Sequence, residues 1–174
     1  LHWEEARQFN VGLDFLAFNN RLSLELDYYV KTTKDILTNV NLPGVSGTSH
    51  NPLSNIATAR NQGLEFNLGW SDNVNGFDYR FNFVGTTLKN EVISVNQDLP
   101  PLENGANRTL VGYPIGGFWG YEVLGIYQNK ETVAQTAHID GAGPGDIWYR
   151  DQNGDGVIDK EDRIYMGSYL PKVT

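Results

Sequence analysis

The feature that most constrains this chain is a period-two alternation of apolar and polar residues in its first half. Successive side chains of a β-strand point to opposite faces, so this spacing predicts strands with one apolar and one polar face. The predicted fold class is mainly β, with antiparallel strands. We predict two hairpins, one pairing Gln8–Phe18 with Arg21–Lys31 and the other pairing Gln62–Trp70 with Phe77–Val84.

The connections between these segments alternate in length, with Asn19-Asn20 short, Thr38–Asn61 long and Ser71–Gly76 short. Membrane β-barrels show this asymmetry, with tight turns on one side of the bilayer and long loops on the other. Aromatic residues cluster beside the short turns, as in an interfacial girdle; they are Phe15, Phe18, Trp70, Phe77 and Tyr79. A soluble antiparallel sandwich whose apolar face packs on a second sheet fits the same alternation, so the pattern alone leaves both architectures open.

Composition removes several other classes of protein. The chain carries 13 basic and 21 acidic residues, and its formal net charge of -8 argues against a nucleic-acid-binding module. It has no Cys, which excludes disulfides, thiol nucleophiles and thiolate metal sites. Four predicted strands cannot close a barrel, because the smallest common membrane barrel has about 8 strands. We therefore expect the chain to be a segment of a larger protein.

An acidic segment in the second half, Asp151–Asp162, matches the spacing of a calcium-binding loop. Oxygen ligands at alternate positions and a Gly at position 6 let a short loop curl around a cation that prefers 6–8 oxygens. The candidate ligands are the side chains of Asp151, Asn153, Asp155, Asp159 and Asp162 and the backbone carbonyl of Val157. Position 12 is Asp162 rather than the usual Glu, and an acidic Gly-turn without metal remains the alternative.

The residues before this loop, Gly145–Tyr149, are predicted to be extended rather than helical. Sensor proteins open a pair of helices when they bind calcium, so we expect a structural Ca²⁺ rather than a switch. His2, His50 and His138 are scattered without the spacing of a zinc site. No pair of residues stands out as catalytic, and the chain is predicted not to be an enzyme.

Several ordered motifs of the chain resemble the SusC/RagA family of TonB-linked outer-membrane proteins of the Bacteroidetes. The motifs are Asn61–Phe66 (NQGLEF), Gly112–Tyr121 (GYPIGGFWGY), Gly125–Gln128 (GIYQ), Gly141–Tyr149 (GAGPGDIWY), the acidic loop, Asp162-Arg163, Gly167-Ser168 and Pro171. This resemblance implies a segment from the C-terminal half of a transmembrane barrel of about 22 strands. The plug domain, the TonB box and the final strands would lie outside this chain.

The resemblance also implies how the chain is divided. Residues 1–95 would form four barrel strands, and residues 96–174 a long extracellular loop region that carries the calcium-like loop and starts the next strand. Leu22, Leu24, Leu26, Leu64, Phe66 and Leu68 would face lipid. Glu25, Asp27, Glu65 and Arg80 would face the lumen.

The function implied by the family is import of oligosaccharides or peptides across the outer membrane of a Gram-negative bacterium. The implied partners are a SusD-like surface lipoprotein, the TonB complex and outer-membrane lipid. A competing interpretation is a soluble or cell-surface calcium-stabilised β-sandwich that binds carbohydrate on Trp119, Tyr121 and Trp148. A glycan-processing enzyme is a third and weaker one.

Overall fold

The computed structural model describes residues 1–40, 52–99 and 102–173. The chain forms two compact units. Unit 1 comprises Leu1–Glu103, Thr109–Gly116 and Ser168–Thr174, and unit 2 comprises Asn104–Arg108 and Gly117–Gly167. His50 and residues 41–51 of the predicted long loop lie outside the described residues.

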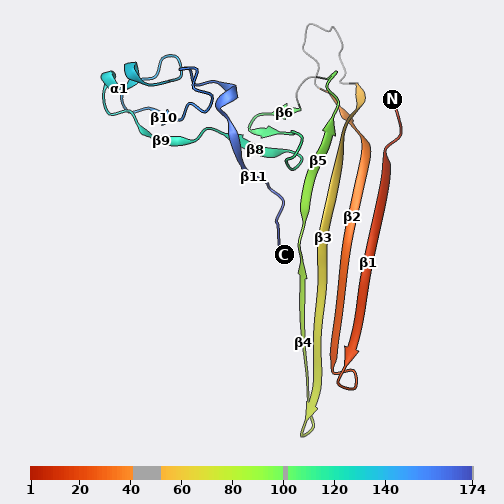
Figure 1. Cartoon of the computed structure of the whole chain (residues 1–174). Coiled ribbons are helices and arrows are strands. Elements are labelled where there is room, and N and C mark those ends of the chain that lie inside the picture. Colours follow the sequence, from red (N-terminus) through yellow and green to blue (C-terminus); the bar gives the residue numbers. More distant parts are fainter. Residues whose placement is uncertain (41–51, 100–101, 174) are drawn as a thin grey trace. The chain divides into compact units, whose positions relative to one another are not determined.

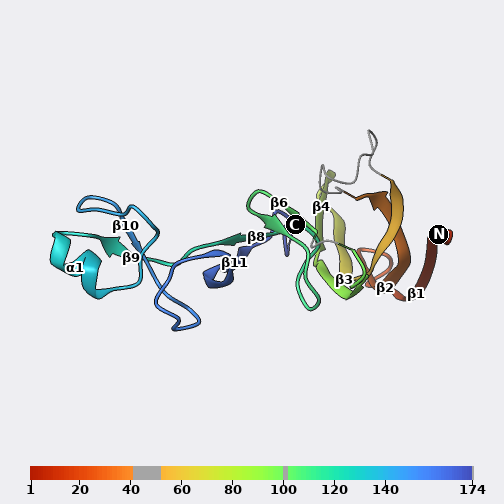
Figure 2. The ribbon, with the colours of Figure 1, turned by 90° about the horizontal axis from the view of Figure 1, so that it is seen from above.

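Unit 1 is built on one antiparallel sheet of long strands (Figure 1). Its neighbouring strands follow the chain order, β1 (Glu5–Ala17), β2 (Leu22–Asn39), β3 (Leu53–Val74) and β4 (Phe77–Thr86). A further strand, β5 (Lys89–Val95), pairs with the part of β3 that extends past β4. Viewed from above, these strands form a single layer (Figure 2). The two predicted hairpins, β1 with β2 and β3 with β4, are confirmed.

The strand lengths correct the sequence analysis. Much of the segment predicted as a loop, Thr38–Asn61, is strand: β2 continues to Asn39 and β3 already begins at Leu53. The start of β3 pairs with β2 on one side and β5 on the other, so backbone hydrogen bonds keep it extended although its side chains do not alternate cleanly. Residues 1–95 accordingly contain a fifth strand that the sequence analysis did not predict.

Both short turns consist of residues that adopt a left-handed backbone. Phe18, Asn19 and Asn20 have φ values of 54°, 56° and 63°, so Phe18 belongs to the turn and not to the strand. The second turn is tighter than predicted, because Ser71–Val74 is still strand and only Asn75 (φ 53°) and Gly76 (φ 85°) reverse the chain. Such positive φ values match the right-handed twist of the flanking strands.

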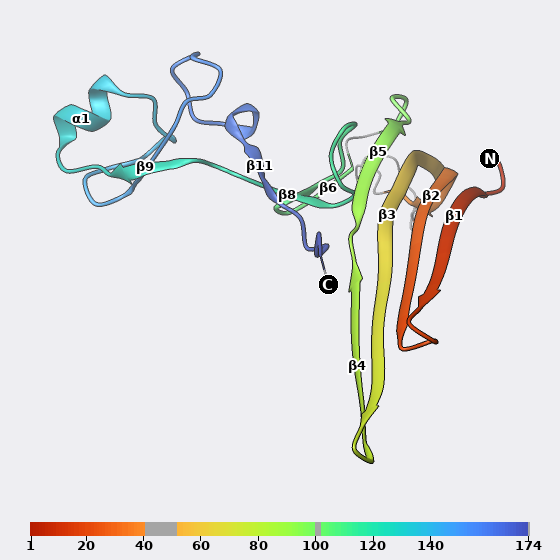
Figure 3. The same cartoon turned by 60° about the horizontal axis from the view of Figure 1, so that its bottom comes forward.

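The strands are staggered along the sheet. Leu22, at the turn end of β2, pairs with Trp70, whereas the β3–β4 hairpin continues to the pair Val74 and Phe77. Figure 3 shows this hairpin extending past the β1–β2 hairpin. Barrels need such a stagger, because their strands tilt relative to the barrel axis.

The outer edge of β4 and β5 is partly paired by segments from later in the chain. Val92 of β5 exchanges two hydrogen bonds with residues 112–113, donating to the carbonyl of Tyr113 and accepting from Gly112, both at 2.9 Å. Further along, Leu88 donates to the carbonyl of Lys172 at 3.0 Å, and Thr87 forms an antiparallel bridge with Val173. The chain thus rejoins the edge of the sheet at its C-terminal end.

Unit 2 contains short elements. They are the end of β6 (Glu103–Asn104), β7 (Asn107–Arg108), β8 (Gly117–Gly120), β9 (Val123–Ile126), α1 (Lys130–Gln135), β10 (Ile147–Tyr149), the 3-10 turn η2 (Lys160–Asp162) and β11 (Ile164–Gly167). Asn129 caps α1 by accepting a hydrogen bond from the backbone N–H of Thr132. No helix in the described part of the chain is long and apolar enough to cross a membrane.

Candidate functional site: a two-faced sheet and an acidic loop

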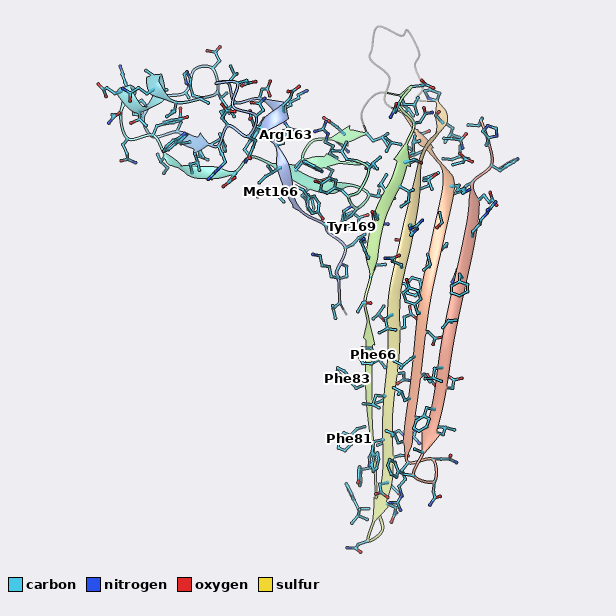
Figure 4. All side chains as sticks on the ribbon, viewed as in Figure 1. Phe66, Phe81, Phe83, Arg163, Met166 and Tyr169 are labelled. Atoms are coloured by element: carbon cyan, nitrogen blue, oxygen red, sulfur yellow. The ribbon has the colours of Figure 1, made fainter. Side chains whose placement is uncertain are left out.

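One face of the main sheet is apolar across four strands. The register places Leu26 of β2 between Leu13 and Phe66, and Leu24 between Phe15 and Leu68, which in turn faces Phe83. Many of these side chains are exposed, with 58% of Leu13, 51% of Phe15 and 64% of Phe83 accessible. Figure 4 shows Phe66, Phe81 and Phe83 along the lower part of β3 and β4. All six residues predicted to face lipid lie on this face.

The apolar band has a definite width. On β1 it runs from Phe9 to Ala17 and is followed at one end by Arg7 and at the other by the Asn19-Asn20 turn. Eight residue steps correspond to about 27 Å along an antiparallel strand, or about 20 Å of depth at the tilt of about 40° common in barrels. That value is close to the apolar belt of about 25 Å in outer-membrane barrels.

Aromatic rings line this face at the end of the sheet that carries the tight turns. Phe18 packs on Trp70 with ring centroids 5.9 Å apart, and Tyr79 lies 5.7 Å from Phe81 and 6.4 Å from Phe77. Amphipathic rings favour the boundary between lipid tails and water. The predicted grouping of aromatics beside the short turns is therefore present in the folded sheet.

The opposite face is polar and carries all four residues predicted to face the lumen. Asp14 lies opposite Glu25, and Asp27 lies opposite Glu65. Asn67 donates a hydrogen bond of 3.0 Å to Glu25. Arg80 shares this face through its pairing with Ser71. Like charges directly opposite each other destabilise a sheet unless water or counterions screen them, so this face is built for an aqueous surrounding.

The acidic loop of unit 2 is held in shape by its own carboxylates. Asp151 accepts hydrogen bonds from the backbone N–H groups of Gly154 and Gly156, at 2.6 and 2.8 Å. Asp155 accepts from the N–H of Val157 at 2.8 Å and from the side-chain amide of Asn153 at 3.0 Å. Gly154 and Gly156 have φ values of 78° and 87°, which explains why glycine occupies both positions.

Asp162 closes the loop and is the one buried charged residue in the described chain. Its two carboxylate oxygens accept from the backbone N–H groups of Gln152 and Asp159, both at 2.8 Å. Burial, the largest influence, raises the pKa of Asp162, but the backbone N–H groups of Asp159, Gln152 and Asn153 that donate to its carboxylate hold the pKa below its usual value. Asp159 in turn caps η2 by accepting from Glu161 at 2.8 Å.

The residues predicted to bind calcium lie in one loop, and Asp162 bonds the backbone near both ends of that loop. Most of the carboxylate oxygens already accept a backbone or amide hydrogen, although a carboxylate oxygen has lone pairs for a second partner. In the described residues, no group of three or more Asp, Glu or His side chains is arranged to hold a metal ion. The backbone of Val157 forms a parallel bridge with that of His138, and Nδ1 of His138 lies 2.8 Å from the carbonyl oxygen of Thr136.

The three aromatic residues proposed as carbohydrate platforms already have partners within unit 2. Tyr121 lies between Tyr149, with centroids 5.1 Å apart, and the guanidinium of Arg163, 5.5 Å from its ring. The ring of Trp119 lies 5.9 Å from that of Tyr165 and 5.8 Å from the guanidinium of Arg108. The ring of Trp148 lies 5.9 Å from that of the buried Tyr127. All three residues are half-buried, and these contacts help to hold the unit together.

The structural role of Glu122 was not predicted from the sequence. Glu122 accepts from both Arg150, at 3.1 Å, and the side chain of Gln152, at 2.9 Å. It thereby links the residue before β9 to the start of the acidic loop. No sequence signal predicts this link, because Glu122 and Gln152 are 30 residues apart and Glu122 belongs to none of the motifs.

Comparison with known proteins gives the family. Residues 1–170 match the family described as TonB dependent receptor-like, beta-barrel. TonB-dependent receptor P3 of Formosa agariphila is 34% identical over 188 residues, which cover 100% of this chain and 18% of that receptor. TonB-dependent receptor SusC of Bacteroides thetaiotaomicron is 25% identical over 173 residues, which cover 94% of this chain and 16% of SusC.

The fold is similar to a solved structure of the RagAB peptide transporter, with a TM-score of 0.77 and 26% identity over 98% of this chain and 18% of that one. The chain thus spans less than a fifth of the length of each of these proteins. The relatives are receptors and transporters, which confirms that the chain does not belong to an enzyme family. The SusC/RagA resemblance read from the motifs is confirmed as well, and the match to nearly every residue shows that this chain belongs to the TonB-dependent receptor family as a segment of its β-barrel.

Proposed function

We propose that this chain is part of the barrel wall of a TonB-dependent transporter that imports oligosaccharides or peptides across the outer membrane of a Gram-negative bacterium. The observation that carries the proposal is the two-faced sheet, with exposed apolar side chains on one face and opposed carboxylates on the other. Exposed apolar surface of this extent is costly in water and favourable in lipid. The polar face would line the water-filled side of the wall.

The long excursion after β5 is proposed to lie on the extracellular side. Both tight turns, at Asn19-Asn20 and Asn75-Gly76, are at one end of the sheet, and β5 ends toward the other. Barrels of this kind have short periplasmic turns and longer extracellular loops. The bridge between Thr87 and Val173 supports the start of a further strand beside β4.

The proposed partners are a SusD-like surface lipoprotein and the TonB complex. The TonB complex would bind parts of the protein outside this chain. SusC and the RagAB peptide transporter among the similar proteins support this choice, and RagAB favours a peptide among the substrate classes.

Cell fractionation and uptake test the proposal. The full-length protein should sediment with outer membranes, resist carbonate extraction and co-purify with a lipoprotein. Deleting its gene, or inactivating TonB, should abolish growth on either an oligosaccharide or a peptide mixture as sole carbon source. Release of the protein by carbonate would favour the soluble sandwich instead.

We also propose that Asp151, Asn153, Asp155, Val157, Asp159 and Asp162 hold one structural Ca²⁺. The ligand spacing and the curl of the loop around Asp151 support this, as does the repulsion among four closely spaced carboxylates that a divalent ion would relieve. Millimolar affinity suffices on an extracellular surface, and Mg²⁺ suits the loop less because it demands near-ideal octahedral geometry.

Calorimetry and thermal unfolding of the full-length protein test this proposal. Binding of Ca²⁺ should give a measurable heat and raise the unfolding temperature. Mg²⁺ at the same concentration should give a much smaller heat and a much smaller rise in unfolding temperature. The double variant Asp151→Ala/Asp155→Ala should lose the effect, and Glu131→Ala, which removes an exposed carboxylate of α1, should keep it. Equal calcium responses in both variants would refute the site.

A further inference from the structure

The apolar face of the main sheet becomes basic at the end opposite the tight turns. The last apolar row pairs Phe9 with Val30, and the same row continues to Gln62 and Lys89. The next row runs from Arg7 through Thr32 and Arg60 to Glu91. Beyond it Glu5 pairs with Lys34. Cross-strand partners share a face, so all these side chains continue the face that carries the apolar band.

The outward basic patch, defined as Arg7, Lys34, Arg60 and Lys89, is compact. Four neighbouring strands span about 14 Å, and alternate residues along a strand are about 7 Å apart. The side chains of Arg7 and Lys89 are 66% and 64% exposed, and Arg60 is exposed as well. The patch therefore offers several cationic groups within the area of one or two lipid headgroups.

The charge of this patch is opposite to that of the chain. Four cations and the two carboxylates of Glu5 and Glu91 leave a local net charge of +2, whereas the chain carries -8. Arg7 contacts Glu5, and Lys89 contacts Glu91, each at 2.7 Å. Exposed pairs of this kind contribute little, and Arg and Lys retain further N–H donors for another anion.

We propose that the outward basic patch binds the phosphate groups of an anionic lipid in the membrane leaflet at this end of the sheet. The inference rests on the proposed function, since it needs the apolar band to meet lipid. Its specific support is continuity: an acyl chain lying along Val11 and Phe9 would place its headgroup against Arg7 and Arg60. A soluble anion gains nothing from the apolar part of this surface, and Arg binds phosphate oxygens in a bidentate manner.

Lipid competition on the full-length protein tests the proposal. The protein is equilibrated in mixed micelles of phosphatidylglycerol and phosphatidylcholine with identical acyl chains, and bound lipids are counted by native mass spectrometry. The parent protein should enrich phosphatidylglycerol. The variant Arg7→Gln/Arg60→Gln should lose about 25-fold of that enrichment, which is about fivefold for each cation removed near an anionic surface.

The matched control is Lys31→Gln, because Lys31 lies on the polar face in the row of Gln8 and Asn61. It should keep the parent's enrichment, and mobility on unboiled gels verifies that each variant is folded. An unchanged enrichment in the double variant, or an equal loss in Lys31→Gln, would overturn the proposal. Displacement of the lipid by inorganic phosphate at equal concentration would also overturn it, in favour of a free-anion site. Outer-membrane fractionation tests the proposed function separately, so the lipid-binding proposal and the proposed function can be refuted independently.

Discussion

An arginine placed at different depths of the apolar band should report where the membrane lies. The central row of the band contains Leu13, Leu26 and Phe66, whereas Leu22 lies four residues from Leu26 in the row of Trp70. Four residues correspond to about 13 Å along the strand and about 10 Å of depth at a tilt of about 40°. Leu26→Arg should therefore cost about 2–4 kcal/mol and Leu22→Arg about 0–1 kcal/mol.

The assay is reversible urea unfolding of the full-length protein in lipid vesicles, which gives the free energy of folding for each variant. A difference of about 2–3 kcal/mol between the two apolar positions means a folding equilibrium constant about 30- to 150-fold smaller for Leu26→Arg. Ser23→Arg, on the polar face, is the control and should cost less than Leu26→Arg because its side chain stays in water.

The order in which the three variants destabilise the protein tests whether this face meets the membrane. A membrane-facing band requires Leu26→Arg to be the most destabilising, with Leu22→Arg and Ser23→Arg much milder. Equal penalties at Leu26 and Leu22 would mean that no depth gradient exists, as in a sandwich whose apolar face is covered by protein. That result would refute the membrane assignment of this face.

Further predictions concern single contacts. Gly63→Ala should destabilise the protein by about 1–3 kcal/mol in the same unfolding assay, because an added Cβ would collide with the carbonyl of Thr87 and the ring of Tyr29. Asp162→Asn should speed hydrogen exchange at the amides of Gln152 and Asp159 by about tenfold or more, because an amide has one acceptor oxygen where two N–H groups each need one. Since the pKa of Asp162 is lowered in the folded loop, its contribution should be complete above about pH 4 and be lost as the pH falls further, which exchange rates corrected for intrinsic pH dependence will reveal. Unchanged exchange in the variant, or protection that increases as the pH falls below about 4, would contradict the role given to Asp162.

The acidic loop illustrates how much of a site local sequence can encode. Glycines at positions 154 and 156 and acceptors at positions 151 and 155 are close in sequence, so the curl of the loop follows from them alone. The burial of Asp162 and the link from Glu122 to Gln152 depend on which strands of unit 2 come together. The same is true of the contacts that Arg108 makes with the ring of Trp119 and Arg163 with the ring of Tyr121.

For the sheet, the side-chain pattern predicts the two faces and the places where the hairpins reverse. Period-two alternation assigns Leu24 and Glu25 to opposite faces whatever the partner strand, and Asn75-Gly76 reverses a chain without outside help. The start of β3, the presence of β5 and the stagger of the β3–β4 hairpin follow from how the strands pair in the folded protein. Those features depend on backbone hydrogen bonds between strands. Every non-proline residue carries the same N–H and C=O groups, so the side-chain pattern does not indicate which strands these hydrogen bonds join.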